Sequence, residues 1–459
     1  PPTARKDFGE GFVTQSMSSL TDSSQSLSWN RQFLDDLCKY KKTYGYVQDP
    51  IKSNFHGWSE ADIGDTEKPK TYINGIHNRI LIGRTYLPRL AETALAVSLG
   101  GFPVRWHEPE VKKRLYSLEL RNCLNFHPDR STEGTFEHFV CLHLPRYLPM
   151  SLVENFDDIQ QAVNHRIKKV PDAFFTAHLH LASDSFLIWA AMKRKNGMRL
   201  ILSQHGGLYG QGIAPTRDSE FEERFADHYL HWGWAKSPNA VRIPSQLNLW
   251  ARRRKKSNKL TQLLLVTDCT FRFSRRPWSN TNENERYRAM LLDTYEALEP
   301  QVKAQTLVRL HHHHDVHDDS HEAFWLGRFP EVNINRGFDP IWKLRRHARL
   351  IVCTSLGTSE IEQFGRNMPT ILRLDPIVHA LRDSCVELFG KMERVGLVHW
   401  STESFSLFMR NHWLDTDGWW ESRETQNVVS EYLSTFGYQC DKPLRHLQKI
   451  LKDVVKAKS

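Results

Sequence analysis

The segment QHGGLYG, residues 204–210, combines residue types that often carry chemistry at the end of a strand. His205 can donate or accept a proton near neutral pH, and Gly206 and Gly207 let the main chain approach a ligand closely. Because loops at strand ends often carry function, we interpret this segment as part of a binding site. The alternative is an ordinary glycine-rich turn in which the histidine caps a carbonyl group.

A second candidate lies in LASDSF, residues 181–186, where Ser183 and Asp184 precede an apolar helical pattern. An aspartate at the start of a helix commonly caps free N–H groups, which is the structural interpretation. The functional interpretation is a carboxylate at the same sheet edge as His205, placed to act as a nucleophile or a base.

The segment LVRLHHHHDVHDDSH, residues 307–321, is rich in histidine and aspartate, which are ligands of zinc, iron and manganese. Adjacent residues of an extended chain point to opposite faces, so at most two of the four consecutive histidines converge on one ion. We therefore favour phosphate binding by Arg309 and one of the histidines 311–314, through charge-assisted hydrogen bonds. We expect no metal site.

The fourth candidate is VCTSLGTSEIEQFGRNMPT, residues 352–370, in which a strand ends in hydroxyl residues before a helix. Free N–H groups at the helix start, with the hydroxyls of Ser355, Thr358 and Ser359, form a candidate anion site. Glu362, one turn further, is placed to accept hydrogen bonds from a ribose diol. A helix with an ordinary cap is the structural alternative.

The pattern around these candidates alternates between strands and helices, which is typical of α/β folds with parallel sheets. Ligands of such folds bind beyond the carboxyl ends of the strands. We predict strands over 172–178, 198–204, 260–268, 304–311, 348–354 and 368–375, with helices over 86–99, 184–197, 283–299, 338–347 and 359–367.

Changes in composition suggest four parts. Residues 1–30 are a polar lead-in or linker, and 31–250 form an N-terminal α/β domain on the acceptor side. The basic run 251–259 opens a C-terminal nucleotide-binding α/β domain over 251–430. Residues 431–459 form a basic amphipathic helix, which either lies on anionic lipid or a partner or packs across the domain.

The 459 residues carry a formal net charge of +9 and include seven scattered cysteines without a CxxC pair. These cysteines argue against a disulfide framework and favour a reducing cytoplasm. The charge fits anionic partners such as nucleotides or an acidic membrane surface. No zinc-finger or RNA-binding signature points to nucleic acid, and no apolar run is long enough to span a bilayer.

Eight segments, in order, resemble a family of bacterial surface-glycan transferases distantly related to the Kdo transferases of lipopolysaccharide and capsule assembly. The resemblance covers about 180–430 and departs from the family at Leu356-Gly357-Thr358 and at His311-His312. The segments are SDSFLIWAA, QHGGLYG, LHWGWA, LLLVTD, LVRLH, VCTSLGTSEIEQFGRNMPT, VGLVH and WWESRETQ.

The resemblance implies a GT-B-like α/β fold, in which two Rossmann-like domains face each other across a cleft and helices follow at the C-terminus. It implies a nucleotide-sugar donor, CMP-Kdo, and a glycan or lipid-linked glycan acceptor at the bacterial surface. The nucleotide would bind Arg309, His311, Thr358 and Glu362. We expect the protein to be cytoplasmic and peripheral on the inner face of the inner membrane.

By the same resemblance, Asp184 attacks the anomeric carbon, and the acceptor then displaces it with net retention of configuration. His205 orients the acceptor or stabilises charge, and the sugar is contacted by Ser183, Gln204, Gly206, Gly207 and Tyr209. Because CMP is a good leaving group, we expect no metal or other cofactor. Two alternatives are a metal-dependent hydrolase that uses the histidine-rich loop and a non-catalytic module of a polysaccharide synthase.

Overall fold

The computed structural model describes residues 80–456, apart from 113, 125–134, 168, 214–215, 250–259, 269–280 and 312–320. The predicted lead-in over 1–30, the basic run over 251–259 and most of the histidine-rich segment therefore lie outside the described residues. Within the described residues, no helix combines the length and the apolar character needed to cross a bilayer.

Internal contacts divide the chain into two compact units. Among the described residues, the first unit comprises 106–170 and 180–196, and the second comprises 80–105, 171–179 and 197–456. Both sheets lie in the second unit. Because the basic run 251–259 is outside the described residues, the domain boundary at 250/251 stays a prediction.

The first unit is helical. It contains α5 (Leu118–Asn122), α6 (Phe136–Tyr147), the 3₁₀ turn η2 (Met150–Leu152), α7 (Phe156–Arg166) and α9 (Asp184–Lys195), and α8 (Leu179–Ala182) leads into it. Helix α9 covers most of the range predicted as a helix, and it ends before Gly197, whose φ of 94° suits a glycine.

A buried ion pair ties the first unit together. Arg121 Nε lies 2.6 Å from Glu154 Oε1, and Arg121 Nη2 donates to Glu154 Oε2 at 2.7 Å. The remaining nitrogen, Nη1, donates to the carbonyl groups of Pro145 and Leu148 at 2.9 and 2.8 Å. The hydrogen bonds from Arg121 lower the pKa of Glu154 to about 2.

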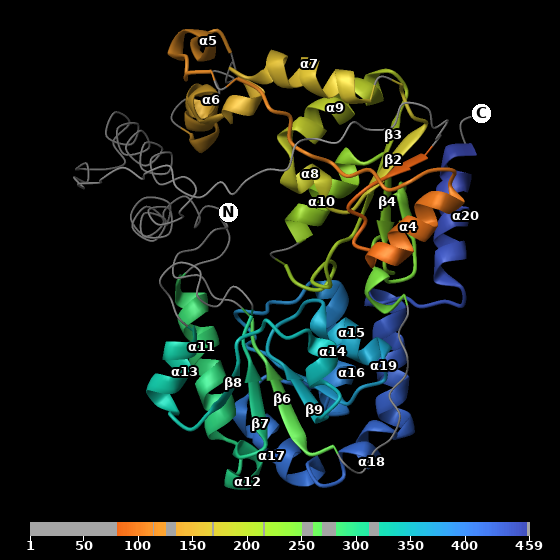
Figure 1. Cartoon of the computed structure of the whole chain (residues 1–459). Coiled ribbons are helices and arrows are strands. Elements are labelled where there is room, and N and C mark those ends of the chain that lie inside the picture. Colours follow the sequence, from red (N-terminus) through yellow and green to blue (C-terminus); the bar gives the residue numbers. More distant parts are fainter. Residues whose placement is uncertain are drawn as a thin grey trace, which may run out of the picture. The chain divides into compact units, whose positions relative to one another are not determined.

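The first sheet of the second unit has five parallel strands in sequential order. They are β1 (Ile80–Ile82), β2 (Ala173–Thr176), β3 (Arg199–Ser203), β4 (His228–His231) and β5 (Ala240–Arg242). Phe174 of β2 pairs with Leu200 of β3, and both side chains are fully buried, as expected for a parallel strand covered on both faces. Helices α4 (Arg89–Ser98) and α10 (Thr216–Phe225) flank this sheet (Figure 1).

The second sheet has six parallel strands in the order β11-β10-β9-β6-β7-β8. The chain enters in the middle, runs outward to one edge, and then returns to the other side of β6. This is the Rossmann order, with its reversal point between β6 and β9. The strands are β6 (Gln262–Val266), β7 (Thr306–Arg309), β8 (Asn333–Asn335), β9 (Ala348–Cys353), β10 (Thr370–Arg373) and β11 (Val398–His399).

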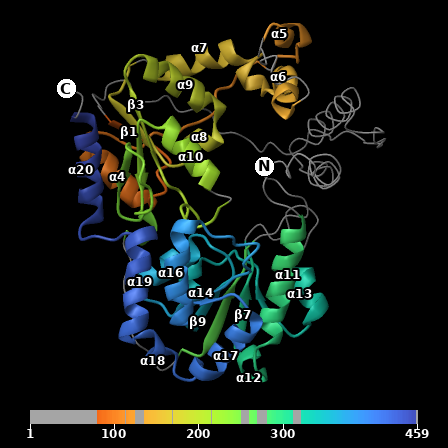
Figure 2. The ribbon, with the colours of Figure 1, turned by 180° about the vertical axis from the view of Figure 1, so that it is seen from behind.

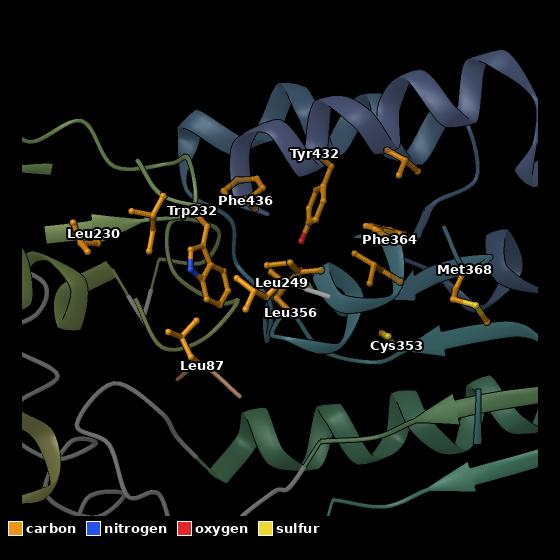
Figure 3. Packing of buried hydrophobic residues seen from close by; sticks show 14 of the residues in the cluster. Leu87, Leu230, Trp232, Leu249, Cys353, Leu356, Phe364, Met368, Tyr432 and Phe436 are labelled. Carbon is orange, nitrogen blue, oxygen red and sulfur yellow. The ribbon is translucent and has the colours of Figure 1, made fainter. Parts of the chain in front are cut away.

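Helices cover both faces of this sheet (Figure 1). They are α11 (Thr281–Glu296), α12 (Pro300–Lys303), α13 (His321–Arg328), α14 (Ile341–Leu344), α15 (Ser359–Gly365), α16 (Asp383–Arg394), α17 (Thr402–His412), α18 (Thr416–Trp420) and α19 (Arg423–Phe436). One continuous cluster of buried apolar side chains includes strands of both sheets and helix α19. Figure 3 shows Trp232, Leu249, Leu356, Phe364 and Tyr432 within this cluster.

The C-terminal helix begins later than predicted. Helix α19 continues past residue 430, and α20 runs over Pro443–Lys456. Leu447, Leu451 and Val454 of α20 are buried, and α20 lies beside α4 in both views (Figures 1 and 2). The interpretation that the apolar face of this helix lies on lipid is therefore wrong, because that face is buried inside the protein, where α20 packs beside α4.

The prediction of an α/β chain with two parallel sheets is confirmed. The six strands predicted above each correspond to an observed strand that is shorter by one to four residues. The further prediction of a strand over 102–106 (FPVRW) is wrong, because no strand forms in that segment. The facing of two domains across a cleft stays a prediction.

Candidate active site

The reversal point of the second sheet is fixed by a chain of hydrogen bonds. The amide of Asp268 donates to the Tyr287 hydroxyl at 2.7 Å, and this hydroxyl lies 2.6 Å from Thr354 Oγ1. Thr354 Oγ1 in turn donates to the carbonyl of Val266 at 3.0 Å. The carboxyl ends of β6 and β9 are thus held in one arrangement, at the place where ligands of doubly wound sheets bind.

Arg309 ends β7 at the same edge. Its Nη2 donates to the carbonyls of Gly337 and Asp339 at 3.3 and 3.4 Å. Its Nε is buried and has no hydrogen-bond partner among the described residues. Burial lowers the pKa of Arg309, and the nearby charges of Glu362 and Asp339 oppose that shift. A guanidinium N–H left without a partner inside protein is a donor available to an anion.

The other residues predicted to bind the nucleotide follow, in sequence, the strands that end at this edge. His311 follows β7, while Ser355, Thr358 and Ser359 follow β9, and all four are partly exposed. Thr358 precedes α15, but its side chain makes no capping hydrogen bond. The structural alternative for this segment, a helix capped by a hydroxyl, is therefore wrong for Thr358, whose hydroxyl is not used as a cap.

Glu362 is tied to two arginines. Its Oε1 accepts from Arg345 Nη1 at 2.8 Å and from Arg366 Nε at 3.2 Å. Both guanidinium groups engage Oε1, so hydrogen bonding of Glu362 to a ribose stays a prediction. Its observed role is to hold α14 and α15 together through these arginines.

Gln204, predicted to contact a sugar, is fully buried and serves the loop itself. Its Oε1 accepts from the Trp232 amide at 3.0 Å and from Trp234 Nε1 at 2.8 Å. Its Nε2 donates to the Gly206 carbonyl at 2.7 Å. Because both ends of the amide are engaged, the prediction of sugar contact is wrong for this residue.

The three glycines of the same loop differ in their surroundings and in their backbone conformation. A Cβ on Gly207 would lie 1.5 Å from the carbonyl oxygen of Gly357, so only glycine fits where the two loops touch. Gly206 has open space, with its nearest neighbour, Tyr209 Cε2, at 3.8 Å. Gly210 has a φ of +78°, which favours glycine. The bare backbone at Gly207 therefore serves packing between loops rather than room for a ligand.

His205 sits in a small polar cluster. The Tyr209 hydroxyl lies 2.8 Å from His205 Nδ1 and donates to Glu222 Oε1 at 3.2 Å. Glu222 is buried, and its Oε1 lies 3.7 Å from His205 Nδ1. The ring of His178 packs edge-on against His205, with centroids 5.7 Å apart. Tyr209 is therefore a buried link between the histidine and a carboxylate, not a surface group for sugar contact.

Asp184 belongs to the first unit. Ser183 precedes α9 and caps it, since its Oγ accepts from the Phe186 amide at 3.0 Å. Asp184 is the first residue of the helix, and its Oδ2 accepts from Ser151 Oγ. The structural interpretation of Asp184 as the helix cap is therefore wrong, because the serine before it does that work.

Asp184 lines a pocket of about 340 Å³ within the first unit. The lining is polar, with two carboxylates, one imidazole and several hydroxyls. It consists of Glu108, Ser151, Ile159, His180, Leu181, Ala182, Ser183, Asp184 and Ser185. Such a lining can hydrogen-bond a polyhydroxylated group, and Asp184 is partly exposed within it.

Sequence reasoning missed Tyr287, Glu222, Glu360 and Tyr432, whose contacts build this region. Tyr287, Glu222 and Tyr432 are at least 13 residues from their side-chain partners, so no local spacing pattern marks them. Glu360 has a local partner in the Gly357 amide, three residues earlier, which was the one signal the sequence offered. Within the described residues, no group of three or more His, Cys, Asp or Glu side chains is arranged to hold a metal ion.

A family model described as LIC12162 family transferase matches residues 9–451. No curated protein matches the sequence. Solved structures with a partial likeness include Acinetobacter baumannii MurG, at 11% identity over 65% of this chain and 80% of that chain, with a TM-score of 0.36. Others are a glycotransferase of kitacinnamycin (9% identity, 82% and 98% covered, TM-score 0.38) and an S. aureus MnaA–UDP structure (11%, 66% and 81%, TM-score 0.38). With TM-scores this low, the fold rests on strand order and register alone.

Proposed function

The chain belongs to the LIC12162 family of transferases, and from this premise we propose that it transfers a sugar from a nucleotide-sugar donor to a glycan acceptor. The observation that carries the proposal is the edge of the second sheet. There the Rossmann reversal point lies beside Arg309, whose buried Nε has no partner among the described residues. A reversal point of this kind, with a cationic donor facing it, suits the phosphate of a nucleotide.

The two loops at the carboxyl edges support the same function. Gly207, two residues after His205, touches Gly357, which lies between Ser355 and Thr358. A group bound on the 354–358 loop is therefore close to the loop that carries His205. The nucleotide is held by Arg309 and the loop hydroxyls, with His311 as a further phosphate ligand.

The donor that the resemblance implies is CMP-Kdo, and the proposed path proceeds with retention. Asp184 Oδ attacks the anomeric carbon, and the bond from that carbon to the phosphate oxygen breaks, so CMP leaves with the electron pair. The acceptor hydroxyl then attacks the same carbon, loses its proton to a base, and displaces Asp184 as a carboxylate. The partial exposure of Asp184 in a polar pocket supports the nucleophile role.

His205 is the proposed base for the acceptor proton. Its cluster with Tyr209 and Glu222 fixes the imidazole and places a carboxylate 3.7 Å away, which would stabilise the imidazolium that forms. The pocket of Asp184 contains Glu108 but neither lysine nor arginine in its lining. For that reason the donor test includes neutral sugars beside Kdo.

Of the alternatives, hydrolysis at the histidine-rich loop has no support among the described residues, since 312–320 lie outside them. Membership of a transferase family favours group transfer. A non-catalytic synthase module would bind a nucleotide without turnover, and the assay below separates the two.

An anionic membrane surface is the proposed location of the acceptor side. With the apolar face of α20 packed, Lys449, Lys452 and Lys456 point outward, and Leu90 and Val97 of the neighbouring α4 are exposed. Basic and apolar groups on adjacent helices suit an anionic headgroup layer. Co-sedimentation with phosphatidylglycerol vesicles, weakened in a K449E/K452E variant and absent with phosphatidylcholine vesicles, would support this location. Equal sedimentation of both proteins would contradict it.

The function itself is tested by a thermal-shift screen of CMP, UDP, GDP and TDP, followed by turnover of the matching nucleotide sugars. A ligand that binds only the folded state raises the apparent melting temperature. We expect one nucleotide to shift it and its sugar to be consumed. Absence of any shift across the panel would contradict nucleotide-sugar transfer. Intact-mass detection of a sugar adduct, lost in Asp184→Asn, tests the retaining path separately.

A further inference from the structure

Glu360 is the one acidic side chain of α15 that lies entirely inside the protein, at 0% exposed. Its Oε1 accepts a hydrogen bond from the Gly357 amide at 2.7 Å. It also accepts from Gln211 Nε2 at 3.4 Å and lies 3.3 Å from the Tyr432 hydroxyl. One carboxylate oxygen thus joins the loop after β9, the loop after β3 and helix α19.

Gln211 completes the link between the two loops. Its Nε2 donates to the Gly207 carbonyl at 2.6 Å, and its Oε1 accepts from the Tyr432 hydroxyl at 2.9 Å. Gly207 is the residue that touches Gly357. In Figure 3 the Tyr432 side chain descends from α19, with its hydroxyl directed toward the segment that carries Leu356.

Among the residues that the structure describes, no cation is paired with Glu360 in this enclosure. Burial raises its pKa to about 7, against the hydrogen bonds from Gly357, Gln211 and Tyr432, which lower it. The titratable groups that face it are neutral near that pH, since burial also raises the pKa of Tyr432 and of the Cys353 and Cys385 thiols. Glu362, on the same helix, is engaged by Arg345 and Arg366. Glu360 Oε2 is buried without a partner among the described residues.

We propose that Glu360 is a positioning residue for donor binding, which sets the 354–358 loop through the Gly357 amide and couples it to the His205 loop through Gln211. This proposal rests on the proposed function, because the loop is the one assigned to the nucleotide. It adds that the protonation state of Glu360, which does not touch the donor, controls how strongly the 354–358 loop is held. The ionised carboxylate holds the Gly357 amide more strongly than the neutral acid does.

The experiment compares Glu360→Ala, Glu360→Gln and the surface control Glu387→Ala, which lies on α16 with its side chain 84% exposed. Alanine removes the acceptor of the Gly357 amide, whereas glutamine keeps an oxygen there and cannot ionise. We expect donor KM to rise about 10-fold in Glu360→Ala with a smaller change in kcat, on the basis of one lost charge-assisted hydrogen bond. Glutamine should restore KM to within a few-fold and abolish its pH dependence between pH 6 and 8.

Hydrogen exchange of the Gly357 amide gives a readout that needs no donor. Relative to Glu360→Gln, the wild-type amide should become more protected from pH 6 to pH 8, and Glu360→Ala should lose protection at both. If no nucleotide binds the wild type, the proposed function fails while the exchange data still decide the role of Glu360.

Unchanged exchange at Gly357 in Glu360→Ala would overturn the proposal. The proposal would also be overturned if the alanine and glutamine variants showed the same rise in donor KM, the same fall in kcat and the same fall in melting temperature. That pattern indicates a purely structural role. Tyr432→Phe provides an independent check. It removes one hydrogen bond to the cluster but leaves the Gly357 contact, so its effect on donor KM should be smaller than that of Glu360→Ala.

Discussion

Two buried glutamates, one in each unit, are treated in opposite ways by their surroundings. Glu154 in the first unit is paired with Arg121, and the guanidinium lowers its pKa to about 2. Glu360 in the second unit accepts hydrogen bonds from neutral donors of the described chain, Gly357, Gln211 and Tyr432, and burial raises its pKa to about 7. The first carboxylate is therefore always charged at neutral pH, while the second sits near its own midpoint.

This difference separates a structural charge from one beside a candidate binding loop. Arg121 uses all three of its nitrogens on Glu154 and on the carbonyls of Pro145 and Leu148 at the end of α6, so the pair holds helices in place. Glu360 instead contacts the loops that carry the proposed donor and acceptor groups. Strongly shifted groups near a cleft or loop edge often mark functional sites.

The largest expected effect is on the structural charge. Glu154→Gln leaves Arg121 buried and unpaired, which should lower the free energy of unfolding by about 3–5 kcal/mol. Asp158→Asn is the matched control and should change stability far less, because its partner Arg114 is half exposed and solvent screens the pair. Urea unfolding of the two variants measures both. Equal losses would show that burial does not distinguish these pairs.

The contact between the two loops should rank second. Gly207→Ala places a Cβ against the Gly357 carbonyl and should cost about 2–3 kcal/mol of stability through overpacking, with loss of nucleotide binding. Gly206→Ala, with open space at its Cβ position, should behave like the wild type. Melting temperatures and binding titrations of the pair test this. A silent Gly207→Ala would mean that the loops do not touch in solution.

Removing Arg309, the candidate hydrogen-bond donor to the phosphate, should weaken nucleotide binding without unfolding the protein. Arg309→Ala should raise the Kd of the nucleotide about 10- to 100-fold, the usual range for a hydrogen bond to a charged group. Arg328→Ala on α13, whose side chain is 57% exposed, is the control. Calorimetric titration gives both constants. Unaltered affinity in Arg309→Ala would move the phosphate away from this edge.

The smallest expected effects are the opposite pH dependences of stability from the two glutamates. Glu154 has a pKa below its usual 4.5, so its contribution is present above pH 4.5 and is lost as the pH falls toward about 2. Glu360 has a pKa above 4.5, so the folded state keeps a proton that the unfolded state has released. Stability therefore falls as the pH rises from about 4.5 to about 7.

Melting curves of the wild type and of Glu360→Gln across this range isolate the second effect. The difference in melting temperature between the two should grow in favour of the glutamine variant from pH 4.5 to 7 and level off above it. A constant difference would show that Glu360 does not titrate there.

Much of the fold was predictable from the sequence, because strand periodicity and strand–helix alternation are local signals. The runs around Leu264 and Ile351 read as buried parallel strands, and they pair with each other in the structure. The strand order was not predictable, since nothing local places β9 beside β6. The predicted C-terminal helix was started too early, at residue 431, because α19 continues to Phe436 before α20 begins at Pro443.

The sequence predicted where the site residues lie better than it predicted what each of them does. Arg309 stands at the reversal point, as expected of a basic residue leaving a strand there. Gln204 was misread because its partners, Trp232 and Trp234, come from another element. A polar side chain beside a glycine-rich loop has the same sequence appearance whether it faces a ligand or braces the backbone.

The most direct measurement is the position of the phosphate in a crystal of the protein soaked with the nucleotide that the thermal-shift panel identifies. The account predicts phosphate oxygens within hydrogen-bond distance of Arg309 Nε and of the 354–358 loop, at the carboxyl ends of β6 and β9. A nucleotide bound at any other edge of either sheet would contradict it.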